Sequence, residues 1–101
     1  MPRETYRYRF DETVSFADAV ATLDLAMIAV QSLYGESRSR LDARFVSDEE
    51  RRTIVIDGST HVGQALNQVF VGYAGREFGK GAFRVERLDR TPAREPAGAA
   101  A

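Results

Sequence analysis

Residues 15–34, SFADAVATLDLAMIAVQSLY, form the longest apolar periodic stretch of this chain and carry only two charges, Asp18 and Asp24. Six of its apolar side chains recur every three or four residues and so share one stripe on a helix: Phe16, Val20, Leu23, Met27, Val30 and Tyr34. Ser15 is a typical N-cap, and Gly35 is typical of a helix end. The stretch therefore predicts a long helix around which the rest of the chain packs.

The opposite side of this helix is also apolar, with four residues off the first stripe: Ala21, Leu25, Ile28 and Ala29. A helix that is apolar on both sides is usually covered on both sides, so these residues predict a second partner surface. The alternative is that Leu25 and Ile28 are isolated exposed residues, which are common on protein surfaces. The two aspartates and Gln31 interrupt the apolar run and argue against a membrane span.

The composition predicts one small domain. The chain has 101 residues, of which 44% are hydrophobic and 29% charged, and its net charge of -1 gives no general attraction to nucleic acid or anionic lipid. Cysteine is absent, which excludes disulfides, thiol catalysis and cysteine metal sites. The first ten residues lack the apolar run of a secretory signal. We therefore expect a cytoplasmic protein with no cofactor, no metal and no membrane partner.

Alternation of apolar and polar residues predicts four strands, at residues 5–10, 40–46, 53–57 and 82–88. The charged run SDEERR, residues 47–52, predicts the turn of an antiparallel hairpin between the second and third strands. A second helix is predicted from Ser59 or Thr60 to about Phe78, with a core stripe of Val62, Leu66, Val69 and Tyr73 that Phe70 widens. Residues 90–101, rich in Pro, Ala and Gly, predict a disordered tail after a single domain of residues 1–89.

Three glycines interrupt the second helix, Gly63, Gly72 and Gly75, each at a cost of about 1 kcal/mol against alanine. Either another backbone packs closely there, or the end of the helix is kinked. The first interpretation extends the partner surface onto this helix. The partner-binding residues predicted on the two helices are Ala21, Leu25, Ile28, Ala29, Val71 and Ala74.

The element order strand, helix, strand, strand, helix, strand predicts an α+β fold of the ferredoxin-like βαββαβ type, with two helices on one face of a four-stranded antiparallel sheet. This resemblance is one of element order alone and covers residues 5–88. The side chains expected toward the helices are Tyr6, Tyr8, Phe10, Leu41, Phe45, Ile54, Ile56, Phe83 and Val85. The open face is then expected to carry Arg7, Arg9, Asp42, Arg44, Val55, Asp57, Arg84 and Glu86.

Two interpretations of this open face remain. Its arginines, Arg7, Arg9, Arg44 and Arg84, could contact nucleic-acid phosphates. Yet RNA-binding sheets of this kind display aromatic side chains for base stacking, whereas the aromatics here are in phase with the core. The alternation of charge favours the other interpretation, a ladder of ion pairs across the strands.

The stretch DGSTHVG, residues 57–63, is the most site-like short segment. Ser59, Thr60 and His61 stand at a predicted helix start, where backbone amides can bind an anion, although Ser and Thr are also ordinary caps. The segment is not a P-loop, because the lysine and the spacing are missing. One histidine without cysteine cannot build a His-based metal site or a Cys/His pair.

The sequence thus predicts a non-catalytic interaction or regulatory module, which forms a homodimer or docks on a partner protein through the outer surface of its helices. The alternatives are a nucleic-acid-associated protein that uses the sheet arginines, or a small ligand-binding protein or enzyme with a site at residues 57–63. No residue is singled out as catalytic.

Overall fold

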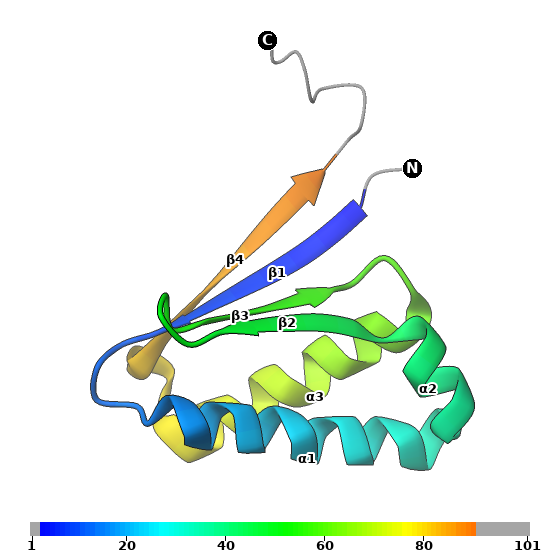
Figure 1. Ribbon diagram of the computed structural model, residues 1–101, viewed down its shortest axis with the longest axis horizontal. Coiled ribbons are helices and arrows are strands. Elements are labelled where there is room, and N and C mark those ends of the chain that lie inside the picture. Colours follow the sequence, from blue (N-terminus) through cyan, green and yellow to red (C-terminus); the bar gives the residue numbers. More distant parts are fainter. Residues whose placement is uncertain (1–2, 91–101) are drawn as a thin grey trace, which may run out of the picture.

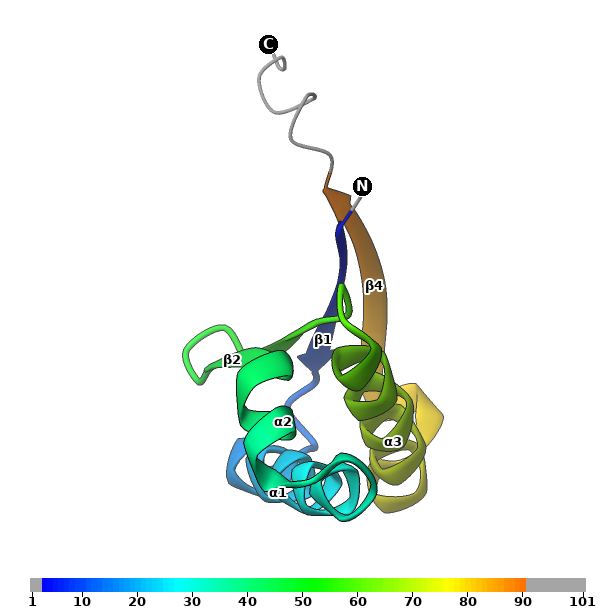
Figure 2. The same cartoon turned by 90° about the vertical axis from the view of Figure 1, so that its right-hand side faces the viewer.

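The computed structural model describes residues 3–90, which form an α+β fold of four strands and three α-helices. The elements are β1 (Arg3–Phe10), α1 (Phe16–Tyr34), α2 (Glu36–Asp42), β2 (Arg44–Asp48), β3 (Thr53–Asp57), α3 (His61–Phe78) and β4 (Phe83–Arg90), with a 3-10 turn at Lys80–Ala82. The sheet is antiparallel throughout, in the order β2-β3-β1-β4, and the helices lie on one face of it (Figures 1 and 2). The tail predicted for residues 90–101 lies outside the described residues from position 91 onward.

The prediction for the first helix is confirmed. Ser15 caps α1 with its hydroxyl, which accepts a hydrogen bond from the backbone N–H of Asp18, and the helix ends at Gly35 with φ +89°. Leu23 and Val30 of the predicted stripe are buried, as is Phe16. Ala19, Thr22 and Ala26 complete the buried side of the helix, and the two small alanines allow close contact with α3.

Strand β1 lies at the centre of the sheet and supplies much of the core. Tyr8 pairs with Ile54 on β3 and with Val85 on β4, so its side chain points toward the helices. The ring is fully buried and meets Phe70 of α3 edge-on, with ring centroids 4.8 Å apart. Its hydroxyl donates to Oδ1 of Asn67 at 2.5 Å, and burial raises the pKa of Tyr8, so the hydroxyl keeps its proton.

The strand predicted at residues 40–46 is wrong in its first half. Residues 36–42 form the short helix α2, which carries the ion pairs Glu36–Arg40 and Arg38–Asp42, each four residues apart. Leu41, expected in the core, is consequently 72% exposed on this helix. A short run such as Leu41, Ala43, Phe45 fits the period of a strand, whereas the charges around it fit that of a helix. β2 begins only at Arg44, and the turn that follows occupies residues 49–52.

The core side of α3 also differs from the prediction in its second half. The fully buried residues follow a spacing of four, Val62, Leu66, Phe70 and Ala74. The expected core residue Tyr73 is instead 39% exposed, because the large ring of Phe70 turns toward Tyr8 and Phe10 and orients the helix. The edge strands are less well covered than expected, since Phe45 and Val85 are 38% and 41% exposed.

The structure distinguishes two glycines of α3 that the sequence did not. A Cβ at Gly63 would lie 2.2 Å from the backbone oxygen of Asp57, whereas a Cβ at Gly72 meets nothing within 4 Å. We expect Gly63→Ala to destabilise the protein by about 1–3 kcal/mol through overpacking. Gly72→Ala, its matched control, should stabilise by up to about 1 kcal/mol through helix propensity. Urea unfolding of both variants checks this, and shifts of the same sign would contradict it.

Candidate functional site

The most distinctive surface of the molecule is the α1 outer face, which consists of Ala21, Leu25 and Ile28 with the flanking Asp18 and Asp24. The three apolar residues are spaced four and three apart, so they share one stripe of the helix. Leu25 and Ile28 are each 58% exposed, and Ala21 is exposed as well. The stripe points away from the sheet because the opposite side of α1 fills the core. The structure therefore places these predicted partner-binding residues together on the surface.

The rest of the predicted partner surface does not join this face. Ala74, expected on the outside of α3, is fully buried in the core, and this prediction is wrong. Val71 is 38% exposed, but it lies one turn after Asn67, which binds Tyr8 of β1, so this side of α3 turns toward the sheet. Ala29 is half-buried on α1. The candidate interaction surface is accordingly narrower than predicted and belongs to α1.

The charges on the α1 outer face are all negative. Within residues 3–90, Asp18 and Asp24 form no ion pair, and α1 contains no basic residue among its 19 positions. The face thus combines two large exposed apolar side chains with two available carboxylates. Such a face is complementary to a partner whose binding surface is apolar and bordered by basic residues.

By length and composition α1 is also the one helix in residues 3–90 that could cross a membrane, with a mean hydropathy of 1.4 over its most apolar window. This is weak evidence, because core helices of soluble proteins meet the same criterion. Here the helix packs on the sheet through its buried side.

In the segment at residues 57–63, the side chains of Asp57 and Thr60 are engaged in local hydrogen bonds. The hydroxyl of Thr60 accepts from the backbone N–H of Gly63 at 2.9 Å and donates to the carbonyl of Asp42 at 2.7 Å. The carboxylate of Asp57 accepts from the N–H of Ser59 at 2.9 Å. His61 is exposed, and its ring lies edge-on to Tyr34 with centroids 6.4 Å apart. Thr60 is thus the N-cap of α3, while Ser59 belongs to a turn held by Asp57.

The open sheet face carries the predicted arginines, although Asp42 is absent from it because it belongs to α2. Arg7 donates to a carboxylate oxygen of Glu86 from Nε at 2.9 Å, and this bond lowers the pKa of Glu86 with help from the charge of Arg7. Arg9 lies directly opposite Arg84 of β4, and neither forms an ion pair within the described residues. The ladder of ion pairs is therefore incomplete at this end of the sheet.

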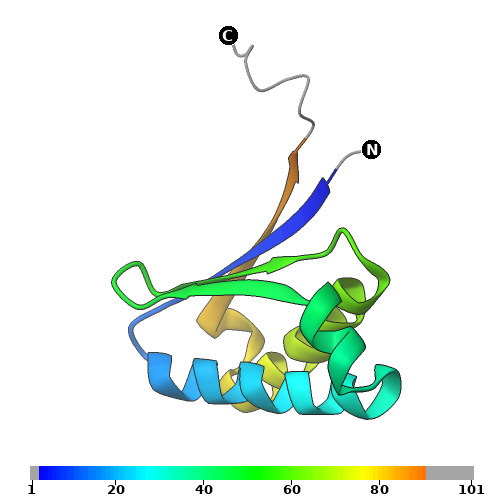
Figure 3. The ribbon, with the colours of Figure 1, turned by 45° about the vertical axis from the view of Figure 1, so that its right-hand side comes forward.

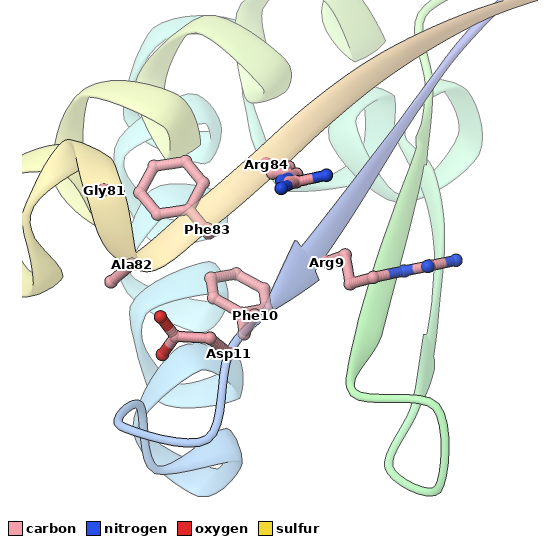
Figure 4. Close-up of a pocket in the computed structure, with 7 residues that line it drawn as sticks. All are labelled: Arg9, Phe10, Asp11, Gly81, Ala82, Phe83 and Arg84. Carbon is pink, nitrogen blue, oxygen red and sulfur yellow. The ribbon is translucent and has the colours of Figure 1, made fainter.

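A shallow hollow of about 330 Å³ lies at Arg9 and Arg84 (Figure 4). Its other walls are Phe10, Asp11, Phe83 and the backbone around Ala82. Figure 4 shows the two arginine side chains leaving their strands in a different direction from the rings of Phe10 and Phe83. The rings pack on each other with centroids 5.5 Å apart, so they belong to the core and offer no stacking platform on the open face.

Comparisons with known proteins add no functional information. No protein-family model matches this chain, and no curated protein matches it significantly in sequence. Among residues 3–90 no group of three or more His, Asp or Glu side chains is arranged to hold a metal ion. The functional argument therefore rests on the surfaces described above.

Proposed function

We propose that the protein is a non-catalytic interaction module that binds another protein chain through the α1 outer face. The observation that carries this proposal is the exposure of Leu25 and Ile28, 58% each, in one stripe between two carboxylates without partners in residues 3–90. Full burial of a Leu or Ile side chain stabilises by about 1.5–3 kcal/mol. Covering both residues therefore supplies a useful part of the binding free energy.

Charge favours a different protein over a second copy on this face. Two α1 helices packed against each other would bring the aspartates of both copies to one interface without a basic residue from either helix. A partner with an apolar surface and a rim of Lys or Arg would instead pair with Asp18 and Asp24.

We further propose that the chain is a member of the ferredoxin-like βαββαβ class. The support is that β1 and β3 lie at the centre of the sheet and that the long helices α1 and α3 follow them. α2 then counts as an addition between the first helix and the second strand. This class hosts many functions, so the assignment itself says nothing about activity.

The proposal predicts a contact that can be trapped. With a photo-crosslinking amino acid in place of Ile28, we expect irradiation of cells that make the protein to give one product of defined mass. The same amino acid at Arg84, which is exposed on the open face of β4 at the other edge of the sheet, is the matched control and should give none. A product twice the 11.2 kDa chain mass would identify a second copy, and any other mass a different partner.

The double substitution Leu25→Glu with Ile28→Lys, made beside a crosslinker at Ala21, should abolish the product. Because both side chains are exposed, it should change the free energy of unfolding by no more than about 0.5 kcal/mol. Circular dichroism and urea unfolding measure that control. Equal products from the Ile28 and Arg84 positions, or a product that survives the double substitution in a folded protein, would refute the proposed face.

A further inference from the structure

Strand β2 forms one free edge of the sheet. It pairs only with β3 in the described chain, and all five of its residues, RFVSD, are exposed or half-exposed. Figure 3 shows β2 running above α1 along this side of the sheet, with no further strand beyond it. Natural edge strands are protected by short length, by charged side chains, by proline or by a bulge. β2 is short and carries Arg44 and Asp48, but it contains no proline, its pairing with β3 is continuous in register, and its two charges are of opposite sign.

The side chains of β2 are complementary to themselves when the strand is reversed. Arg44, Val46 and Asp48 alternate on the open face, while Phe45 and Ser47 point to the helix side. If two copies pair antiparallel about a two-fold axis at Val46, Arg44 of each lies opposite Asp48 of the other, and the two Val46 residues meet. Opposite charges directly across a strand pair are favourable.

Other registers lose this match. A shift that keeps the helices of both copies on the same side moves the axis by one residue, to Phe45 or Ser47. Either shift separates Arg44 from Asp48 and leaves part of the five-residue strand unpaired. The register at Val46 is therefore the one that uses the whole strand and forms both charge pairs.

The residues of this pair are available in the single chain. Val46 is 66% exposed, and Arg44 is exposed on the open face, opposite Asp57 of β3. A guanidinium has five N–H donors, so Arg44 can reach a second carboxylate across the edge as well. Asp48 holds the turn through the N–H of Arg51 at 3.3 Å and a loose contact of 3.8 Å with its guanidinium. A carboxylate can accept more bonds than these.

We propose that two copies of this chain join edge to edge through β2, which produces one continuous eight-stranded antiparallel sheet with the helices of both copies on the same face. This proposal goes beyond the partner-binding role of α1 and uses a different surface. Because the α1 outer face points away from the sheet, it stays exposed, and the dimer carries two copies of it.

Charge reversal provides the test. Light scattering over a concentration series should give twice the 11.2 kDa chain mass for the unaltered protein. Arg44→Asp places aspartate opposite aspartate at both ends of the interface, and Asp48→Arg places arginine opposite arginine. Each variant alone should raise the dissociation constant at least about tenfold. An equimolar mixture should recover the double mass, since every pair is then again Arg with Asp.

Controls separate this proposal from the one on α1. The variant Leu25→Glu with Ile28→Lys should remain a dimer, and so should Arg51→Asp, a charge reversal next to the strand. A monomeric unaltered protein at several hundred micromolar would overturn the proposal. So would a mixture of the two folded variants that stays monomeric, or a dimer that only the α1 substitutions dissociate.

A crosslink keeps the test valid if a charge variant does not fold. Residues directly opposite each other in an antiparallel pair approach closely enough for a disulfide, and the chain has no cysteine of its own. Val46→Cys should form a disulfide-linked dimer under mild oxidation, and Ser32→Cys on exposed α1 should not. Equal or no crosslinking of the two variants would contradict the β2 register.

Discussion

Replacement of Phe70 by alanine is expected to lower the free energy of unfolding by about 3–5 kcal/mol. Phe70 is fully buried and its ring contacts both Tyr8 and Phe10, so the truncation opens a cavity between α3 and the central strand β1. Small domains are stable by about 5–15 kcal/mol, so the variant is expected to be at best marginally folded. Urea unfolding followed by circular dichroism measures the change.

Val71 is the matched control for Phe70, because it is the next residue of the same helix and is 38% exposed. Val71→Ala should cost no more than about 1 kcal/mol, since little buried apolar surface is lost and alanine favours the helix. If the two variants lose similar amounts, the orientation of α3 described here is wrong. A larger loss for Val71 than for Phe70 would contradict both this orientation and the core stripe predicted from the sequence.

Arg52→Ala is expected to cost about 2–4 kcal/mol, because hydrogen bonds from a charged donor are among the stronger ones. The guanidinium of Arg52 donates to the backbone carbonyls of Asp11, at 2.9 Å, and Val14, and its Nε donates to that of Phe10 at 3.3 Å. One side chain from the β2–β3 turn thus holds the whole connection between β1 and α1. Its removal leaves three carbonyls without this donor.

The neighbour Arg51 provides the control for Arg52. Its side chain is 82% exposed and makes only a loose contact with Asp48, so Arg51→Ala should stay within about 0.5 kcal/mol of the unaltered protein. Arg52 also has φ +56°, a left-handed conformation that glycine adopts more readily than arginine or alanine. Arg52→Gly would relieve that strain and should therefore lose less than Arg52→Ala. An Arg52→Ala variant that is more stable than Arg52→Gly would contradict the strain assigned to the positive φ of Arg52.

The two proposed surfaces imply a simple arrangement when taken together. β2 pairing would join two copies at the edge of the sheet, and the α1 outer face of each would remain open to a partner. A dimer of this kind offers two equivalent docking faces, which strengthens binding to a partner that also carries two sites. The charge-reversal mixture and the crosslink at Ile28 test the two halves of this arrangement independently.

Several elements could be predicted because local chemistry alone specifies them. Ser15 and Gly35 bound α1, the alternation of Tyr6, Tyr8 and Phe10 defines β1, and the charged turn before Thr53 separates two strands. These signals act within a few residues, so no distant contact is needed to produce them. The apolar outer stripe of α1 was visible for the same reason, because Leu25 and Ile28 do not fit the core stripe.

Other features depend on which surfaces of the elements pack together, and only the tertiary structure decided them. Residues 36–42 form a helix that contacts α1 and α3 and buries Ser39, Phe70 and not Tyr73 determined the inward side of α3, and Ala74 followed it into the core. Gly63 and Gly72 are alike in sequence, yet only the first faces the backbone of Asp57. Likewise Arg44, Val46 and Asp48 can pair with an antiparallel second copy of their own strand only because β2 lies at the edge of the sheet. The sequence by itself determined the local elements of this protein, whereas burial and the position of each strand decided which side chains are left to bind.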